Sequence, residues 1–256
     1  MEPTSFRARF PSQSLPGIAT FLLTRTLATL FYTFAYRLRV YNVQRVPDAG
    51  ACLIASNHQS HLDPPAIACA IQHRAIHFVA KAELFKFKPF GAYISALNSI
   101  PVKQDGSADV SAIREILTRL ELGVPVLIFP EGSRCFDGRL APFQRGVSLM
   151  MKKARCPVVP CAVEGCFDTW PRTRPFPRFW GRRVGVMFGD PIPPEELLRD
   201  GPDAALARLA RAIEDLRVQL RERMRASSAG RFPPPGQGDS RATILSPPTP
   251  APGVPA

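Results

Sequence analysis

The chain has 256 residues, of which 45% are hydrophobic, and this excludes a chain too short or too polar to bury a sizeable core. Lys and Arg number 33 against 21 Asp and Glu, so the formal net charge is +12. This charge favours an anionic partner, namely nucleic acid, anionic lipid or a phosphorylated substrate, and does not choose among them.

Residues 18–36 are apolar almost throughout and predict a long helix. The stretch nearly reaches the roughly 20 residues that cross a bilayer, but Arg25 and several threonines interrupt it. We expect a helix that lies in or dips into the membrane surface, in preference to a full span or a signal peptide. A core helix that buries one apolar face is the alternative. Residues 1–37 are therefore interpreted as an N-terminal membrane-associating segment.

Beyond residue 38, short apolar runs alternate with helical patterns. This alternation predicts a single α/β domain over residues 38–225, with a mixed, largely parallel sheet flanked by helices. Its last helix is expected to pack through its leucines and to turn Glu214 and Arg221 outward. Pro, Gly and Ser dominate residues 226–256, which predicts a disordered tail. The strands are predicted at 51–55, 76–79, 126–129, 157–163 and 184–188, and the helices at 66–71, 107–122, 146–154 and 203–224.

The six cysteines include no C-x-x-C pair, and most of them lie in apolar runs. This usage predicts small buried side chains in a reducing compartment. A zinc site built from Cys156, Cys161 and Cys166 would lack the usual ligand spacing.

The segment 56–63 directly follows a predicted buried strand, and ligands of α/β sheets bind at such strand ends. His58 is a natural general base because the unperturbed pKa of histidine is about 6.5. Asp63 lies across a turn, where its carboxylate can accept the Nδ1 proton of His58 and leave Nε2 to take a proton from substrate. His61 is the rival base and the rival partner for Asp63.

A second segment, residues 129–134, leaves another predicted buried strand and so opens onto the same sheet edge. Gly132 allows a tight turn, and Arg134 can bind a phosphate bidentately. Glu131 is expected to orient Arg134 or a substrate hydroxyl. Positive charge from neighbouring segments is expected to add to the site, from Lys81, Lys103, Arg139 and Arg145.

Together these segments resemble the glycerophospholipid acyltransferase family, whose best-known members acylate lysophosphatidic acid. The resemblance covers residues 38–195. Residues 57–63 are similar to the family's H-x-x-x-x-D catalytic motif, and residues 129–134 to its acceptor-phosphate motif, with Ser133 where Thr is common. Lys103 stands where the family usually has Arg, which keeps the charge without the planar fork. Further similar segments are 81–85, 158–160 and 189–192.

The resemblance implies transfer of a fatty acyl group from acyl-CoA or acyl-carrier protein to the free hydroxyl of a lysophospholipid, with 1-acyl-glycerol-3-phosphate as the leading acceptor. It implies His58 and Asp63 as catalytic residues, and no cofactor or metal besides the donor co-substrate. The implied partners are the acceptor, the donor and an anionic membrane surface at the cytoplasmic face of the cell membrane, with no nucleic acid. The implied substrate-binding residues are Asn57, Ser60, Lys103, Glu131, Gly132, Ser133 and Arg134.

Three alternatives stay open at this point. Glycerol 3-phosphate or another lyso-lipid is an alternative acceptor for the same chemistry. A lipid-binding or scaffold protein would keep the fold without the reaction. A metal hydrolase would use side chains whose H-x-x-H-x-D pattern lacks a usual metal-ligand spacing, with candidate ligands His58, His61, Asp63, His73 and His77.

Overall fold

The computed structural model describes residues 14–102 and 110–241. Lys103, predicted to bind substrate, lies outside these residues, as do positions 107–109 at the start of one predicted helix.

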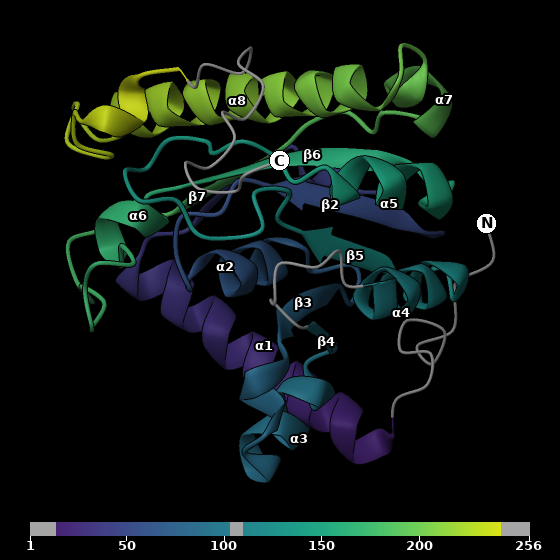
Figure 1. Ribbon diagram of the computed structural model, residues 1–256. Helices are drawn as coiled ribbons and strands as arrows, with labels where there is room; N and C mark the ends of the chain where they lie inside the picture. Colours follow the sequence, from purple (N-terminus) through teal and green to yellow (C-terminus); the bar gives the residue numbers. More distant parts are fainter. Residues whose placement is uncertain (1–13, 103–109, 242–256) are drawn as a thin grey trace, which may run out of the picture.

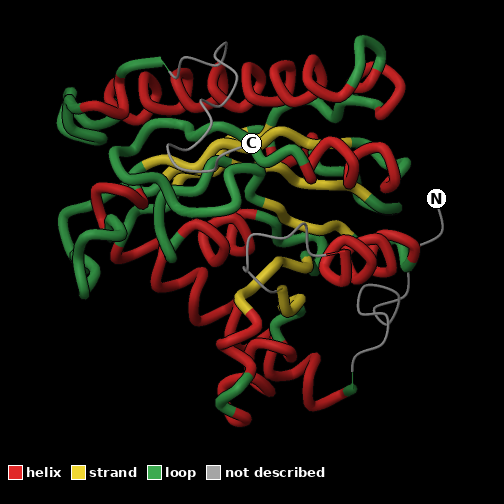
Figure 2. Tube along the Cα trace, in the orientation of Figure 1, coloured by secondary structure: helices red, strands yellow, loops and turns green. Residues whose placement is uncertain are grey.

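In the described ranges the chain forms one seven-stranded sheet in the order β1-β7-β6-β2-β5-β3-β4, with helices on both faces (Figures 1 and 2). Strands β2 to β6 run parallel to one another, whereas β7 is antiparallel to β6 and parallel to β1. The predicted mixed, largely parallel sheet is therefore confirmed. The strands are β1 Arg39–Tyr41, β2 Cys52–Ser56, β3 His77–Lys81, β4 Ser99–Val102, β5 Pro125–Ile128, β6 Val158–Glu164 and β7 Gly185–Phe188. The helices are α1 Leu15–Ala35, α2 Asp63–Ala70, α3 Lys88–Ala96, α4 Val110–Glu121, α5 Gly146–Ala154, α6 Cys166–Thr169, α7 Pro194–Leu198 and α8 Pro202–Ala226, with 3-10 turns at Val43–Arg45, Ala82–Phe85 and Gln237–Asp239.

The sheet separates two hydrophobic cores because successive side chains of a strand point to opposite faces. In β2, Ile54 packs in the core that includes α1 and α2, whereas Leu53 and Ala55 pack with α4, α5 and α8. Figure 1 shows α8 along one face of the sheet and α2 along the other. Strands β2 and β5 are parallel neighbours, with Ala55 opposite Ile128. The segments that follow these two strands therefore leave the same edge of the sheet.

Helix α1 has two apolar faces. It begins after Ser14, whose hydroxyl accepts a hydrogen bond from the Gly17 N–H as an N-cap. One face buries Phe21 and Tyr32 against the domain, and the Tyr32 hydroxyl donates to the Leu62 carbonyl at 2.9 Å. The other face is exposed and lies at helical spacing, with Leu23, Leu27, Leu30 and Phe34. In the described residues, α1 is the one helix whose length and composition would let it cross a membrane.

Helix α8 differs from its expected packing because it buries charge. Arg217 and Arg221 point inward and form salt bridges with Glu164 of β6 at 3.2 and 2.6 Å, and Arg217 also pairs with Glu214 at 2.7 Å. The prediction that Glu214 and Arg221 face outward is therefore wrong. Charged side chains can be buried in this way because each has a partner of opposite sign.

The segment 227–241 continues from α8 and folds back on it. Asp239 forms salt bridges with Arg221 at 3.0 Å and with Arg225 at 2.7 Å, and Ser228 and Gly238 are buried. Disorder was predicted from residue 226, and for this segment the prediction is wrong. The prediction rested on composition alone, whereas the segment is ordered by its ion pairs with α8. Residues 242–256 lie outside the described ranges.

Candidate active site

The loop that leaves β2 begins at Asn57, which joins this strand to its neighbour β6. The Asn57 amide nitrogen donates to the Val163 carbonyl at 2.9 Å, and its amide oxygen accepts from the Val163 N–H at 2.8 Å. The side chain is buried, and both of its polar atoms are used. Asn57 therefore holds the base of the loop, and its predicted contact with substrate stays untested.

His58 and Asp63 meet as the spacing predicted. The His58 Nδ1 lies 2.9 Å from Asp63 Oδ2, and the same oxygen accepts the N–H groups of Gln59 at 2.6 Å and Ser60 at 2.7 Å. Asp63 is the first residue of α2 and is fully buried, whereas the His58 side chain keeps 18% of its surface exposed. A Nδ1–H bound to Asp63 leaves the Nε2 lone pair to accept a proton. The Phe129 ring stacks on the imidazole at a centroid distance of 4.0 Å and fixes its plane.

Ser60 serves the loop as well. Its hydroxyl donates to the Trp170 carbonyl at 2.7 Å and accepts from the Leu62 N–H at 3.2 Å, and the residue is fully buried. These bonds tie the loop between β2 and α2 to the chain after α6. As with Asn57, substrate contact through this side chain is untested.

Glu131 links the two motif segments. One carboxylate oxygen accepts the His58 N–H at 2.6 Å, and the other accepts the Ala141 N–H at 2.8 Å. Burial raises the pKa of this carboxyl to about 8, against the lowering effect of these two backbone donors. Because both oxygens are used, the geometry assigns Glu131 to holding the His58 backbone. The predicted contact of Glu131 with Arg134 or with a substrate hydroxyl stays a prediction.

Glu131→Gln is expected to lower the free energy of unfolding by about 1–3 kcal/mol, because an amide has one acceptor oxygen and one of the two backbone N–H groups loses its partner. The folded protein holds the Glu131 proton more tightly than the unfolded chain does, so the stability from this group is largest below pH 4.5 and falls as the pH rises toward 8. The difference in unfolding free energy between wild type and Glu131→Gln should therefore become smaller as the pH rises from 4.5 to 8. Urea unfolding at several pH values measures this difference. Glu222→Gln, on the exposed surface of α8, is the matched control, and an equal loss in both variants would contradict the assignment.

The predicted phosphate-binding turn lies next to this pair. Gly132 adopts a φ of +72°, which favours glycine, and Gly132 and Ser133 are exposed at the turn. The Cys135 N–H donates to the His58 carbonyl at 2.8 Å, so Arg134 is held one residue from a direct link to the loop that carries His58. Arg134 is half-buried.

Positive charge surrounds this turn. Burial and then the nearby Arg134 and His58 lower the pKa of His61, which favours its neutral form. The Arg172 guanidinium donates to the Arg134 carbonyl at 3.1 Å and stacks on the Phe136 ring at 4.0 Å. The site therefore combines a base with a cationic surface, as a phosphorylated acceptor would require.

Two contacts at the site were not predicted. Gln59, next to His58, donates through its amide to the Gly138 carbonyl at 3.2 Å and to the Glu164 carboxylate at 3.1 Å. Arg172 arrives from the loop after α6. A long-range contact made by a common polar residue leaves no pattern in the sequence, so neither role had a local signal.

The metal-hydrolase alternative conflicts with the topology. His77 begins β3, opposite Val126 near the start of the parallel strand β5, whereas His58 follows the end of β2. The two histidines therefore lie at opposite edges of the sheet. In the part of the chain that the structure describes, no group of three or more His, Cys, Asp or Glu side chains could hold a metal ion. All six cysteines are free and buried, as predicted.

A largely parallel α/β sheet that carries a His–Asp pair and an arginine turn at one edge holds the groups that general acid–base catalysis on an anionic substrate would need. The chain belongs to the acyltransferase family, because the family model described as Acyltransferase matches residues 37–164, which is half of the chain. This match contains both motif segments.

Similar curated proteins carry consistent names. The chain is 30% identical over 132 residues to 1-acyl-sn-glycerol-3-phosphate acyltransferase BAT2 of Brassica napus, which covers 51% of this chain and 38% of that protein. It is 30% identical over 128 residues to the 1-acyl-sn-glycerol-3-phosphate acyltransferase of Bacillus subtilis, covering 50% and 63%. The bovine alpha form is 28% identical over 195 residues, covering 75% and 67%. The first two alignments thus span less than two thirds of each relative.

The fold also matches a solved structure. The crystal structure of the 1-acyl-sn-glycerophosphate acyltransferase PlsC from Thermotoga maritima superposes with a TM-score of 0.61 at 25% sequence identity. The match covers 82% of this chain and 86% of that one.

Proposed function

We propose that this protein transfers a fatty acyl group from an acyl thioester to the free hydroxyl of 1-acyl-sn-glycerol 3-phosphate, giving phosphatidic acid. The observation that carries this proposal is the His58–Asp63 pair, 2.9 Å apart and backbone-linked to the Arg134 turn. The names of the relatives and of the structural neighbour support the acceptor.

In the proposed reaction His58 acts as the base. Its Nε2 takes the hydroxyl proton as the acceptor oxygen bonds to the thioester carbonyl carbon. The carbon–sulfur bond then breaks, and the imidazolium returns the proton to the departing thiolate, so that the products are an ester and a thiol. Asp63 stabilises the imidazolium and keeps the ring orientation. This route requires no covalent acyl-enzyme, no metal and no cofactor besides the donor, which is acyl-CoA or acyl-carrier protein.

The proposed function is tested by incubating purified protein with acyl-CoA or acyl-carrier protein and a panel of acceptors, followed by mass spectrometry of the products. The panel contains 1-acyl-glycerol-3-phosphate, glycerol 3-phosphate and a lysophosphatidylcholine. Phosphatidic acid is the expected product. If only glycerol 3-phosphate is acylated rapidly, it is the acceptor in place of 1-acyl-glycerol-3-phosphate. If neither donor supports transfer, the protein binds lipid without catalysing the reaction.

We assign the acceptor phosphate to Arg134. Arg134→Ala is expected to lower kcat/KM for 1-acyl-glycerol-3-phosphate by about 10- to 100-fold, chiefly through KM, because a charged hydrogen bond contributes about 1.5–3 kcal/mol. For acceptors that lack a phosphate, kcat/KM of the variant should fall much less. Arg211→Ala, on the exposed surface of α8, is the control for the lost charge. If the variant loses phosphorylated and unphosphorylated acceptors equally, Arg134 does not bind the phosphate.

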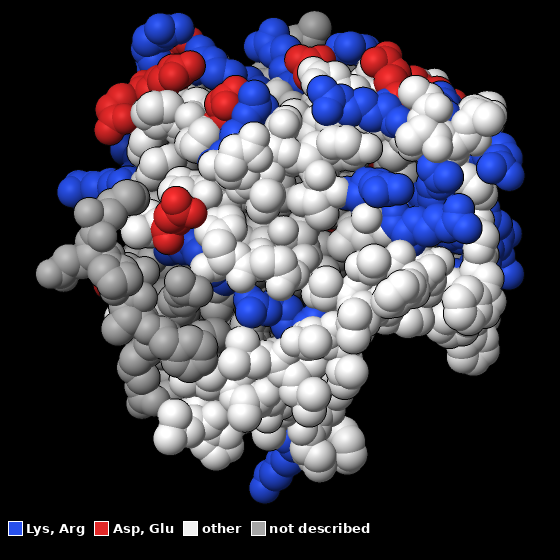
Figure 3. All heavy atoms as spheres, turned by 180° about the vertical axis from the view of Figure 1, so that it is seen from behind, with Lys and Arg blue, Asp and Glu red and all other residues white. Residues whose placement is uncertain are grey.

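The proposal includes a membrane surface at the cytoplasmic face, where thioester donors are soluble. The exposed stripe of α1 supports this, since Leu23, Leu27, Leu30 and Phe34 form one apolar face. In the space-filling view from behind, the lower part of the molecule is almost without charge, while Lys and Arg gather above it (Figure 3). The buried contact of Tyr32 with Leu62 ties the opposite face of α1 to the domain. This contact favours a helix that lies on the membrane over one that spans it.

A further inference from the structure

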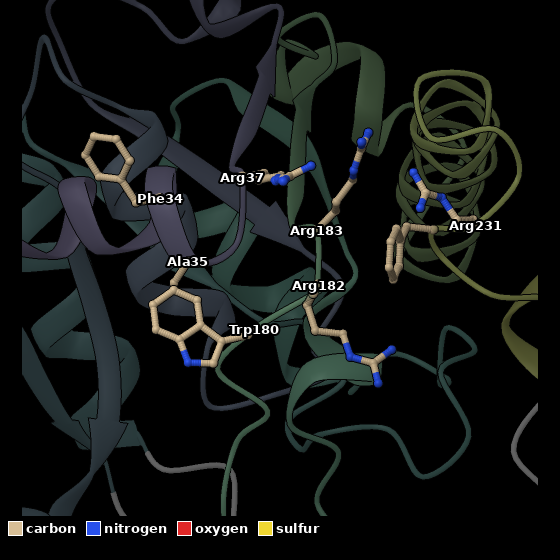
Figure 4. Close-up of a pocket in the computed structure, with 9 residues that line it drawn as sticks. Phe34, Ala35, Arg37, Trp180, Arg182, Arg183 and Arg231 are labelled. Atoms are coloured by element: carbon tan, nitrogen blue, oxygen red, sulfur yellow. The ribbon is translucent and has the colours of Figure 1, made fainter.

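A pocket with a volume of about 270 Å³ lies outside the candidate active site, at the carboxyl end of α1 (Figure 4). Its walls come from three segments far apart in the sequence: the end of α1, the loop before β7, and the segment after α8. The described residues that line it include four arginines and no acidic residue. The lining residues used below are Phe34, Arg37, Trp180, Arg182, Arg183 and Arg231.

Two of the four arginines are held in place by the protein yet keep donors for a ligand. Arg183 donates through one nitrogen to the Ser227 carbonyl at 2.7 Å, and Arg231 donates through Nε to the Ser228 carbonyl at 3.1 Å. A guanidinium has five N–H donors, so most remain. The Arg182 Nε is buried and has no hydrogen-bond partner in the described part of the chain. A buried N–H without an acceptor is unfavourable unless a ligand supplies one.

Arg37 stands at a backbone position suited to glycine. Its φ is +47°, and the Leu38 N–H closes the end of α1 by donating to the Tyr32 carbonyl at 3.0 Å. Helices that end in this way usually have glycine at the left-handed position, because other residues are strained there. The protein thus keeps a guanidinium at the pocket against a local conformational preference.

The rim of the pocket is apolar and faces outward. Phe34 is the last member of the exposed apolar face of α1 and is 75% exposed, and Trp180, which lies beside the end of α1 in Figure 4, is 77% exposed. Tryptophan favours the membrane interface, where an aromatic ring meets both hydrocarbon and headgroups. The pocket therefore lies where the apolar stripe would leave the hydrocarbon and reach the phosphate level of a lipid layer.

We propose that this pocket binds the phosphate group of an anionic membrane phospholipid, as a site separate from the acceptor-phosphate site at Arg134. The inference rests on the proposed membrane-surface function and adds the site that recognises the surface. Charge complementarity carries it, because the guanidinium groups of Arg37, Arg183 and Arg231 lie toward one side of the pocket (Figure 4) and no carboxylate lines it in the described residues. A phosphate free in solution has the same chemistry, and the experiment separates the two sources.

The first measurement is binding to vesicles of phosphatidylcholine with or without phosphatidylglycerol. The double variant Arg37→Gln/Arg231→Gln is compared with Lys152→Gln/Arg211→Gln, which removes the same charge from exposed positions on α5 and α8. The pocket variant should bind phosphatidylglycerol vesicles at least about 10-fold more weakly than wild type, and the control should bind nearly as wild type. Equal losses in both variants, or no loss in the pocket variant, would overturn the site.

The second measurement places the lipid at the pocket. Vesicles with a spin label on the headgroup should quench wild-type fluorescence, and the quenching should be lost in Trp180→Phe. Arg37→Gly guards against a folding defect, since glycine suits the left-handed backbone and should raise thermal stability while weakening vesicle binding. Unquenched Trp180, or full binding by Arg37→Gly, would overturn the proposal.

The remaining arms identify the source of the phosphate and separate this inference from the proposed function. Inorganic phosphate at millimolar concentration should not displace the wild-type protein from vesicles. If it does, the ligand of the pocket is a soluble phosphate and not a lipid. Acyl transfer to a short-chain soluble acceptor without vesicles should be equal in the pocket variant and wild type. A loss there would make the pocket part of the active site. If wild type transfers no acyl group, the proposed function fails, while vesicle binding still decides the pocket.

Discussion

His58→Ala is expected to lower kcat for acyl transfer by about 10²- to 10⁴-fold, which is the usual contribution of a general acid–base residue. KM for both substrates should change little, because the imidazole acts on the proton in transfer and does not anchor either substrate. Initial rates at saturating donor and acceptor measure this. The fold should persist, since the side chain lies partly exposed on Phe129.

His61→Ala is the control for this experiment. His61 was the rival base, but its ring lies against Trp170 at a centroid distance of 5.3 Å, and the Asp63 carboxylate is directed at His58. The His61 variant should therefore keep most of its kcat. A loss as large as that of His58→Ala would move the base to His61 or require both rings.

Asp63→Asn should have an effect of similar size, about 10²- to 10⁴-fold on kcat, because the neutral amide no longer stabilises the imidazolium. An amide oxygen can still accept the Gln59 and Ser60 N–H groups, so the loop should stay folded, and circular dichroism should show a native melt. The double variant with His58→Ala should be no slower than His58→Ala alone, since the pair acts as a unit. Multiplying effects in the double variant would contradict a shared role.

The sequence could predict this pair because the relevant geometry is local. A buried strand, a turn and a helix start follow one another, so five residues separate His58 from Asp63 and the fold returns one to the other. The same logic predicted β2 and β5, whose apolar runs are bounded by turns, and helix 146–154, which matches α5. Local order along the chain was sufficient for each of these elements.

Other features depend on contacts that no local pattern records. Strand β1 has only three residues and was missed, and β4, which contains Pro101, was not among the strands predicted from apolar runs. The bonds from the Glu131 carboxylate to backbone N–H groups were not predicted, because the positions of these groups exist only in the folded loops. The inward arginines of α8 were read as a solvent face because the buried carboxylate of Glu164 comes from a distant strand.

The contact between Gln59 and Glu164 determines when, during synthesis, the loop that carries His58 can become fully ordered. Glu164 also holds Arg217 and Arg221, and Arg221 in turn binds Asp239. On the ribosome, His58 and Asp63 are synthesised early. The Glu164 carboxylate that accepts from Gln59, however, gains its arginine partners only after α8 and the segment through Asp239 have emerged. Nascent chains that stop before α8 should therefore contain His58 and Asp63 in a loop that is not yet fully ordered. We expect acyl transfer to begin only late in synthesis.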